Sequence, residues 1–119
     1  MNKKKILEAD LQISCIQWFD IQYPKMRVLL FHVPNSGRFP IQYRVKLKRM
    51  GLRPGVSDLL LSKSKGNFHG LYMELKVGYN KLTAEQEEFK NLVTKEGFAF
   101  EEIRTLERFI EVVNAWLAK

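Results

Sequence analysis

The sequence predicts an α/β fold in which a small mixed β-sheet is flanked by helices. Segments with apolar residues at helical spacing alternate with short runs rich in apolar and β-branched residues, and Gly or Pro residues separate them. The predicted order is helix, strand, helix, strand, strand, helix, strand, helix, which favours helices packed on a sheet. A length of 119 residues suits one core, so we expect residues 1–119 to form a single domain.

The first half of the chain is predicted to contain a helix, a strand and a second helix. Apolar residues recur at helical spacing over residues 3–20, as on one side of a helix. Residues 27–33, with the sequence RVLLFHV, predict a strand. A basic helix is expected over residues 40–50, because Pro40 suits a first turn and Gly51 suits a helix end.

Two strands are expected in the middle of the chain, over residues 57–62 and 70–77. Residues 65–67 (KGN) predict a hairpin-like turn between them. Antiparallel pairing through this turn would bring the start of the first strand close to the end of the second.

The last part of the chain is predicted to contain a helix, a strand and a final helix. Thr83 and Gln86 have the spacing of a capping box at a helix start, and Gly97 ends that helix. A strand follows over residues 98–103, and Thr105 caps the last helix, whose apolar residues form one stripe.

The charge of the chain is unevenly distributed along the sequence. The net charge is +7, with 15 Lys or Arg against 5 Asp or Glu through Leu82, and 5 against 8 from Thr83 onward. The densest basic block covers residues 38–53 and contains no acid. A one-sided basic surface suits a polyanion such as nucleic acid. The alternative is a solvated helix surface on a basic protein.

Composition excludes several classes of site. The single cysteine, Cys15, excludes an intramolecular disulfide and a cysteine-based zinc site, favours the cytoplasm, and is expected to be a buried small hydrophobe. No apolar run is long enough to span a bilayer, so no membrane partner is expected. The lysine-rich start is not followed by an apolar stretch, so a signal peptide is not predicted.

Three residues form the candidate catalytic site. Asp58 opens an apolar strand, and Glu74 lies in the middle of the next one. Side chains two apart on a strand point to the same side, so Glu74 and Lys76 project together, within reach of Asp58 if the two strands pair. Neighbouring carboxylates repel unless a cation neutralises them, and oxygen ligands select Mg²⁺ or Mn²⁺.

Such an arrangement fits hydrolysis of a phosphodiester. A divalent ion lowers the pKa of a bound water and stabilises developing negative charge, and a neighbouring lysine orients or deprotonates the water or stabilises the phosphorane. The alternative is a structural Glu–Lys pair on a strand, with Asp58 capping a turn.

Five segments in succession resemble the motifs of the VRR-NUC family, a branch of the PD-(D/E)XK nuclease superfamily. They are residues 32–38 (HVPNSGR), 47–51 (LKRMG), 54–59 (PGVSDL), 71–76 (LYMELK) and 82–86 (LTAEQ). The resemblance covers about residues 6–103. It implies a restriction-endonuclease-like core with a central mixed sheet, and DNA as the substrate, including branched DNA and four-way junctions.

The resemblance also assigns roles to residues. Asp58, Glu74 and Lys76 match the signature positions, the main-chain carbonyl of Leu75 would be a further metal ligand, and Glu8 matches an acid on the first helix. The proline that often precedes the signature aspartate is Ser57 here, which removes no ligand. For Glu8 the alternative is a solvated helix acid near a positive helix end.

Further contacts are assigned in the same way. Gln86 matches a family glutamine of the catalytic site, a role that can coexist with the capping box. Asn35 and Arg38 match a loop expected to contact DNA or support the site, although Asn35 could equally serve a turn. On the basic helix, Arg44, Lys48 and Arg49 are expected to contact phosphates.

The sequence therefore predicts a metal-dependent DNA endonuclease, working as a homodimer because one such site cuts one strand. The first rival is a DNA-binding protein without catalysis, and the second is an assembly protein with a basic surface. Two apolar clusters are candidate dimer interfaces: Trp18, Phe19, Ile21 and Tyr23 in one, Trp116 and Leu117 in the other.

Overall fold

A four-stranded mixed sheet forms the centre of the fold, in a computed structural model that describes residues 3–34 and 39–118. The strand order is β1-β2-β3-β4. The strands are β1 (Leu30–His32), β2 (Leu59–Leu61), β3 (Leu71–Leu75) and β4 (Ala99–Ile103). The first three pair antiparallel, and β3 pairs parallel with β4. The mixed sheet predicted from the sequence is confirmed.

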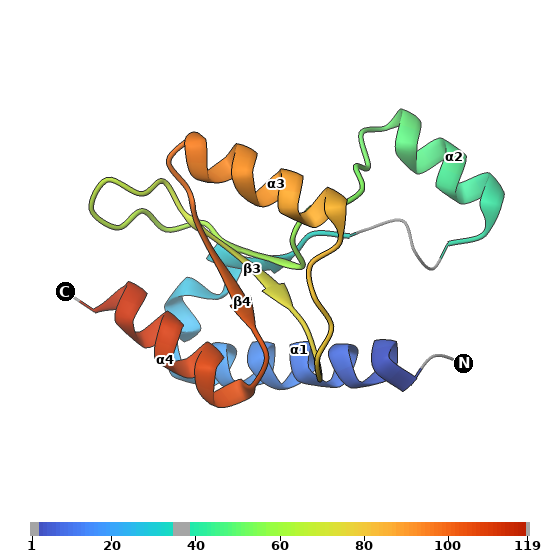
Figure 1. The fold of residues 1–119 in the computed structure, drawn as a ribbon. Coiled ribbons are helices and arrows are strands. Elements are labelled where there is room, and N and C mark those ends of the chain that lie inside the picture. Colours follow the sequence, from blue (N-terminus) through green and yellow to red (C-terminus); the bar gives the residue numbers. More distant parts are fainter. Residues whose placement is uncertain (1–2, 35–38, 119) are drawn as a thin grey trace.

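Helices cover both sides of this sheet (Figure 1). They are α1 (Lys3–Gln22), α2 (Ile41–Arg49), α3 (Ala84–Lys95) and α4 (Leu106–Leu117). α1 and α4 contact each other and the sheet from one side, and α3 contacts β4 from the other. α2 projects from the body as an arm, and its described side chains are all exposed or half-buried.

Strand alternation explains the two layers. Leu71, Met73 and Leu75 of β3 are buried in the core between the sheet, α1 and α4. Tyr72 points to the other side, where its ring meets that of Phe89 on α3 at a centroid distance of 4.9 Å. Glu74 has the same parity as Tyr72, so its carboxylate leaves the strand on the α3 side.

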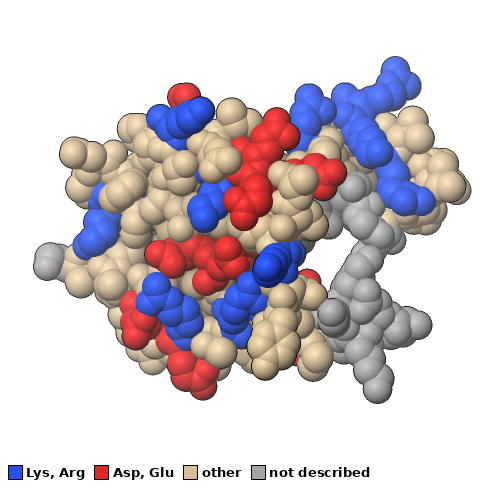
Figure 2. Space-filling view, in the orientation of Figure 1, with Lys and Arg blue, Asp and Glu red and all other residues tan. Residues whose placement is uncertain are grey.

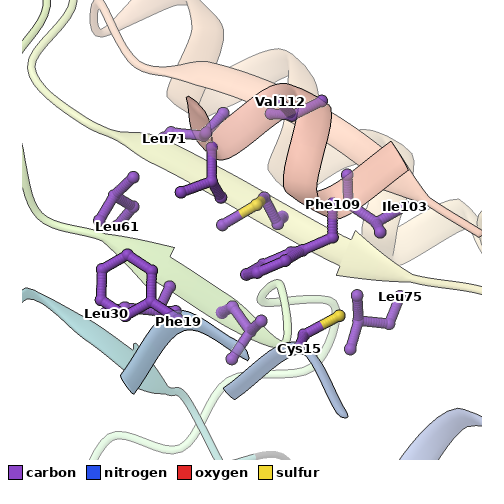
Figure 3. Close-up of a cluster of buried hydrophobic side chains, with 12 residues drawn as sticks. Cys15, Phe19, Leu30, Leu61, Leu71, Leu75, Ile103, Phe109 and Val112 are labelled. Atoms are coloured by element: carbon purple, nitrogen blue, oxygen red, sulfur yellow. The ribbon is translucent and has the colours of Figure 1, made fainter. Parts of the chain in front are cut away.

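The core is built mainly from aliphatic and aromatic side chains of α1, the sheet and α4 (Figure 3). Cys15 and Phe19 of α1 meet Phe109 of α4 there, and all three are fully buried. Burial raises the pKa of the Cys15 thiol to about 12. The expectation that Cys15 is a buried small hydrophobe is confirmed, and its thiol is not a nucleophile at neutral pH.

The helix starts follow the predicted capping chemistry. The Thr83 hydroxyl accepts a hydrogen bond from the Gln86 N–H at 3.2 Å, and the Gln86 side chain accepts from the Thr83 N–H at 2.9 Å. Thr105 accepts from the Arg108 N–H at 3.1 Å at the start of α4. Gly97, with φ +90°, follows α3 and allows the turn into β4.

The predicted first strand is too long. Residues 27–29 belong to a 3₁₀ helix, η1 (Pro24–Leu29), and only Leu30–His32 is strand. Its neighbour β2 is three residues long, so a longer β1 would lack a pairing partner. The strands expected over 57–62 and 70–77 are likewise shorter, at Leu59–Leu61 and Leu71–Leu75.

The apolar clusters offered as dimer interfaces are largely used within the chain. Phe19 is fully buried, and the Trp18 ring lies 6.0 Å from that of Phe109. Trp116 donates from Nε1 to the Lys63 carbonyl at 2.7 Å. Of the first cluster, Ile21 is the residue that stays largely exposed, at 76%. Within the described part of the chain, no helix is long and apolar enough to cross a membrane.

Candidate active site

Asp58, Glu74 and Lys76 meet at one end of the β2–β3 pair. Leu59 pairs with Met73 in the antiparallel register, so the next positions, Asp58 and Glu74, lie opposite each other. The Leu75 N–H donates to Asp58 Oδ2 at 2.8 Å, which fixes the Asp58 carboxylate beside β3. The structure thus brings together the three residues that the sequence selects.

Glu74 and Lys76 are withdrawn from solvent, and Asp58 is half-buried. Glu74 is 4% exposed and Lys76 is 8% exposed, an unusual degree of burial for charged residues. Gln86 Nε2 donates to Glu74 Oε2 at 3.3 Å, and Lys76 is held through its N–H, which donates to the Ile103 carbonyl at 3.0 Å. Burial of charged groups is unfavourable unless partners compensate them.

Glu74 is the electrostatic centre of the site. Burial, followed by the charge of Asp58 and a hydrogen bond with it, raises the pKa of Glu74 to about 9. The charge of Lys76 lowers this pKa, and that of Glu8 raises it. Glu74 Oε1 is buried and has no hydrogen-bond partner among the described residues. The carboxyl pair therefore needs a proton or a cation to be stable.

The donor set fits a hard divalent cation. It comprises the Asp58 and Glu74 carboxylates, and no partner for Glu74 Oε1 lies within the described part of the chain. The Leu75 carbonyl points to the same strand edge as its N–H, and so toward Asp58. Among residues 3–34 and 39–118, no group of three or more His, Cys, Asp or Glu side chains has metal-site geometry. Glu8, half-buried on α1, thus acts on Glu74 by charge without completing a three-acid cluster.

Gln86 closes the capping box and also contacts Glu74. Its Oε1 accepts from the Thr83 N–H, which closes the capping box, while its Nε2 donates to Glu74. Gly55 lets the loop before Asp58 approach the same helix start closely. A Cβ at Gly55 would lie 2.5 Å from the Glu85 carbonyl oxygen. The first turn of α3 therefore contacts both Glu74 and the loop that precedes Asp58.

Arg104 is a site-supporting residue that the sequence did not indicate. Its guanidinium donates to the Gly78 carbonyl at 3.0 Å and to the Asn80 carbonyl at 2.6 Å, and it pairs with Glu102 at 3.0 Å. The segment it holds, residues 77–82, connects Lys76 to α3. Its partners are main-chain carbonyls, which no sequence pattern identifies.

His32 is a second such residue. Its Nδ1 lies 3.0 Å from the Asp58 carbonyl oxygen, and the Val33 N–H donates to the same oxygen at 2.9 Å. A carbonyl only accepts, so Nδ1 carries the proton in this contact. His32 lies within the segment 32–38 that resembles a family motif, which was the available signal.

The cations of the basic arm, helix α2, differ in their exposure. Lys48 and Arg49 of α2 are exposed, whereas Arg44 is half-buried and its buried Nε has no hydrogen-bond partner among the described residues. Figure 2 shows Lys and Arg side chains over α2, whereas acidic and basic side chains are mixed over the body of the molecule. The predicted DNA contacts Asn35 and Arg38 lie outside the described residues.

The sheet order, the flanking helices and the two acids beside a lysine define a restriction-endonuclease-like α/β domain. A solved structure described as a VRR_NUC domain protein is similar to this chain, with a TM-score of 0.78 and 26% sequence identity. The similarity covers 92% of this chain and 87% of that one. The chain therefore has a VRR-NUC family fold. A scan against protein families finds no match, and a search of curated proteins finds none either.

Proposed function

We propose that this protein is a DNA endonuclease that hydrolyses phosphodiester bonds with Mg²⁺ or Mn²⁺. The observation that carries the proposal is the buried Glu74 with the half-buried Asp58 opposite it and the buried Lys76 beside it, and Glu74 Oε1 has no hydrogen-bond partner within the described part of the chain. A buried acid with a second acid and a buried lysine beside it is costly to keep as a structural device, because each charge needs compensation. Perturbed, buried titratable groups are typical of functional sites.

Asp58, Glu74 and the Leu75 carbonyl would hold the cation. Glu8 on α1 is proposed as an additional acidic ligand. When bound, the ion supplies Lewis-acid stabilisation of the phosphate and a water of lowered pKa. Lys76 lies beside the acids, where its ammonium can orient a water or stabilise negative charge on the phosphate oxygens. Gln86 holds the Glu74 carboxylate in place through its Nε2.

DNA would approach along the basic arm. Arg44, Lys48 and Arg49 would contact phosphates, which position a duplex without reading its sequence. Asn35 and Arg38, which precede α2 in the sequence, are proposed as further DNA contacts. A phosphate-based interface fits a nuclease that selects DNA structure rather than sequence, with branched DNA and four-way junctions as its substrates.

The proposed working unit is a homodimer. A single site cuts one strand, and a symmetric cut needs two sites related by a twofold axis. The cytoplasm, which the single cysteine favours, is the proposed location.

The test is cleavage of labelled DNA across a metal titration. Linear, flapped, nicked and four-way DNAs of shared sequence would be incubated with purified protein and Mg²⁺, Mn²⁺, Ca²⁺ or chelator. Cleavage that needs Mg²⁺ or Mn²⁺ and disappears in Lys76→Ala supports the proposal. Tight binding without cleavage would make the protein a non-catalytic DNA-binding module, and failure to bind would favour an assembly role.

A further inference from the structure

Tyr79 is an exposed aromatic side chain close to the proposed site. Its relative exposure is 102%, the highest value among the exposed large hydrophobic residues of the described chain. It lies in the segment 77–82, between Lys76 and the first turn of α3. An aromatic ring that is fully exposed close to the proposed site is available for contact with a bound substrate.

The backbone on both sides of Tyr79 is fixed. The carbonyls of Gly78 and Asn80, the residues directly before and after it, accept hydrogen bonds from the same Arg104 guanidinium at 3.0 and 2.6 Å. Arg104 is itself paired with Glu102 of β4. Two contacts from one planar group hold the turn against the sheet. The turn therefore loses little conformational entropy when Tyr79 binds a ligand.

Tyr79 also lies within reach of a strand bound at the acids. It follows Lys76 by three residues, and an extended chain of that length spans at most about 11 Å. Successive nucleotides of one strand are separated by about 3.4 Å, so Tyr79 can meet a base within about three nucleotides of a phosphate at Lys76.

The surroundings of Tyr79 fit nucleic acid better than an apolar protein surface. Gly78, directly before Tyr79, and Lys81, two residues after it, are exposed, and Val77 is half-buried. A lone aromatic ring next to a glycine and a lysine is much smaller than the contiguous apolar patch that marks a protein interface. Stacking on a base needs one ring, and nearby positive charge attracts the phosphates.

We propose that Tyr79 stacks on an unpaired DNA base next to the cleaved phosphate, and thereby selects DNA with unstacked bases over continuous duplex. The inference rests on the proposed nuclease function and adds the residue that recognises the substrate. In a continuous duplex both faces of each base are covered, and opening a step costs free energy. At a branch, flap or gap a base face is already available, so the ring gains the contact at lower cost.

The test measures binding separately from cleavage. In a Lys76→Ala background, affinity would be measured for a flapped DNA and a linear duplex of the same sequence, with 2-aminopurine at the unpaired position. Tyr79→Ala should weaken binding of the flapped DNA by roughly 5- to 100-fold, and that of the duplex by much less. The 2-aminopurine signal should lose its protein-induced quenching. Tyr79→Phe should retain both properties, because the ring is kept.

Two further variants separate stacking from general binding. Tyr43→Ala removes another exposed tyrosine, 57% exposed on α2, and should change the affinities of both DNAs alike. Arg104→Lys keeps the charge but cannot donate to two carbonyls as a planar fork, so it should lower the preference for the flapped DNA in part. If Arg104→Lys leaves the preference for flapped DNA unchanged, the contacts of Arg104 with the Gly78 and Asn80 carbonyls do not position Tyr79.

Other outcomes overturn the proposal without touching the nuclease function. If Tyr79→Ala keeps the preference for flapped DNA, or Tyr79→Phe loses as much as Tyr79→Ala, then base stacking is wrong. If Tyr79→Ala changes the mass in light scattering, Tyr79 is a contact between subunits. A wild-type protein that shows the Tyr79-dependent preference but cuts no DNA with either metal would instead defeat the nuclease proposal alone.

Discussion

Asp58 and Glu74 lie opposite each other across the β2–β3 pair, and the Asp58 carboxylate accepts a hydrogen bond from the Leu75 N–H at 2.8 Å. In the absence of a cation, a proton on Glu74 is the remaining way to relieve their repulsion. The stability of the fold is therefore expected to depend on pH and on the proposed metal.

The first prediction concerns pH without metal. The folded chain holds the proton of Glu74 up to a pKa of about 9, against an ordinary value of 4.5, so it binds this proton more tightly than the unfolded chain does. The stabilisation is fully present below the ordinary value and is lost as pH rises through the folded value. The free energy of unfolding should therefore fall between those limits, by at most about 1.4 kcal/mol per pH unit.

Melting curves in chelator from pH 5 to pH 9 would measure this slope. Glu74→Gln cannot ionise and should flatten it, whereas Glu87→Gln, an exposed acid of α3, should leave it in place. A melting temperature that rises with pH in the wild type and in Glu74→Gln alike would contradict the assignment.

The second prediction concerns metal. A cation that binds the folded chain alone should raise the melting temperature, by about 10 °C at roughly 100 times the dissociation constant. Asp58→Asn should remove most of this shift, because it removes one ligand charge. The control is again Glu87→Gln, and an equal shift in Asp58→Asn would place the ion elsewhere.

The third prediction concerns catalysis. Lys76→Ala and Asp58→Ala should each lower the cleavage rate by at least about 100-fold, because each removes charge from the site. Circular dichroism should show that the variants remain folded. Lys95→Ala, on the exposed last turn of α3, should cut normally. A folded Lys76→Ala protein that cuts at the wild-type rate would remove the lysine from the mechanism.

The fourth prediction concerns the basic arm. Alanine at Arg44, Lys48 or Arg49 should weaken binding of every DNA sequence and lower the salt slope by roughly one each. Lys48 and Arg49 are the cleaner tests, since Arg44 is half-buried and its removal also changes packing. Lys25→Ala, exposed on η1, is the control. A triple variant that binds DNA as tightly at low salt would show that α2 is not the docking surface.

The proximity of Asp58, Glu74 and Lys76, the candidate catalytic residues, could be predicted from sequence because their geometry follows from two simple rules. Alternation places Glu74 and Lys76 on one side of a strand, and a short hairpin connection places Asp58 opposite Glu74. The capping box of α3 could also be predicted, because Thr83 and Gln86 are only three residues apart. Interactions set within one turn or one hairpin leave a pattern in the sequence.

The rest of the site depends on contacts that leave no such pattern. Arg104 and His32 bind main-chain carbonyls, which every residue carries, so their partners follow only from the folded chain. The first strand was overestimated because strand length depends on the neighbour, and β2 is short. The aromatic residues at the end of α1 were predicted as a dimer interface, because sequence alone does not show that α4 packs against them.

The last prediction is that the active unit is a homodimer. A chain with one Asp58–Glu74–Lys76 site cuts one strand, so symmetric cleavage needs two chains. Since Phe19 and Trp18 pack within the chain, the interface must use other surfaces, and Trp18→Ala should lower stability without dissociating the dimer. Light scattering at micromolar concentration, with and without DNA and metal, would give the mass. Mixing wild type with excess Lys76→Ala chains should yield nicked rather than fully cut four-way DNA, because most of the dimers that contain a wild-type chain then hold only one competent site. A protein that stays monomeric with DNA and metal present, and still makes paired cuts, would defeat the prediction.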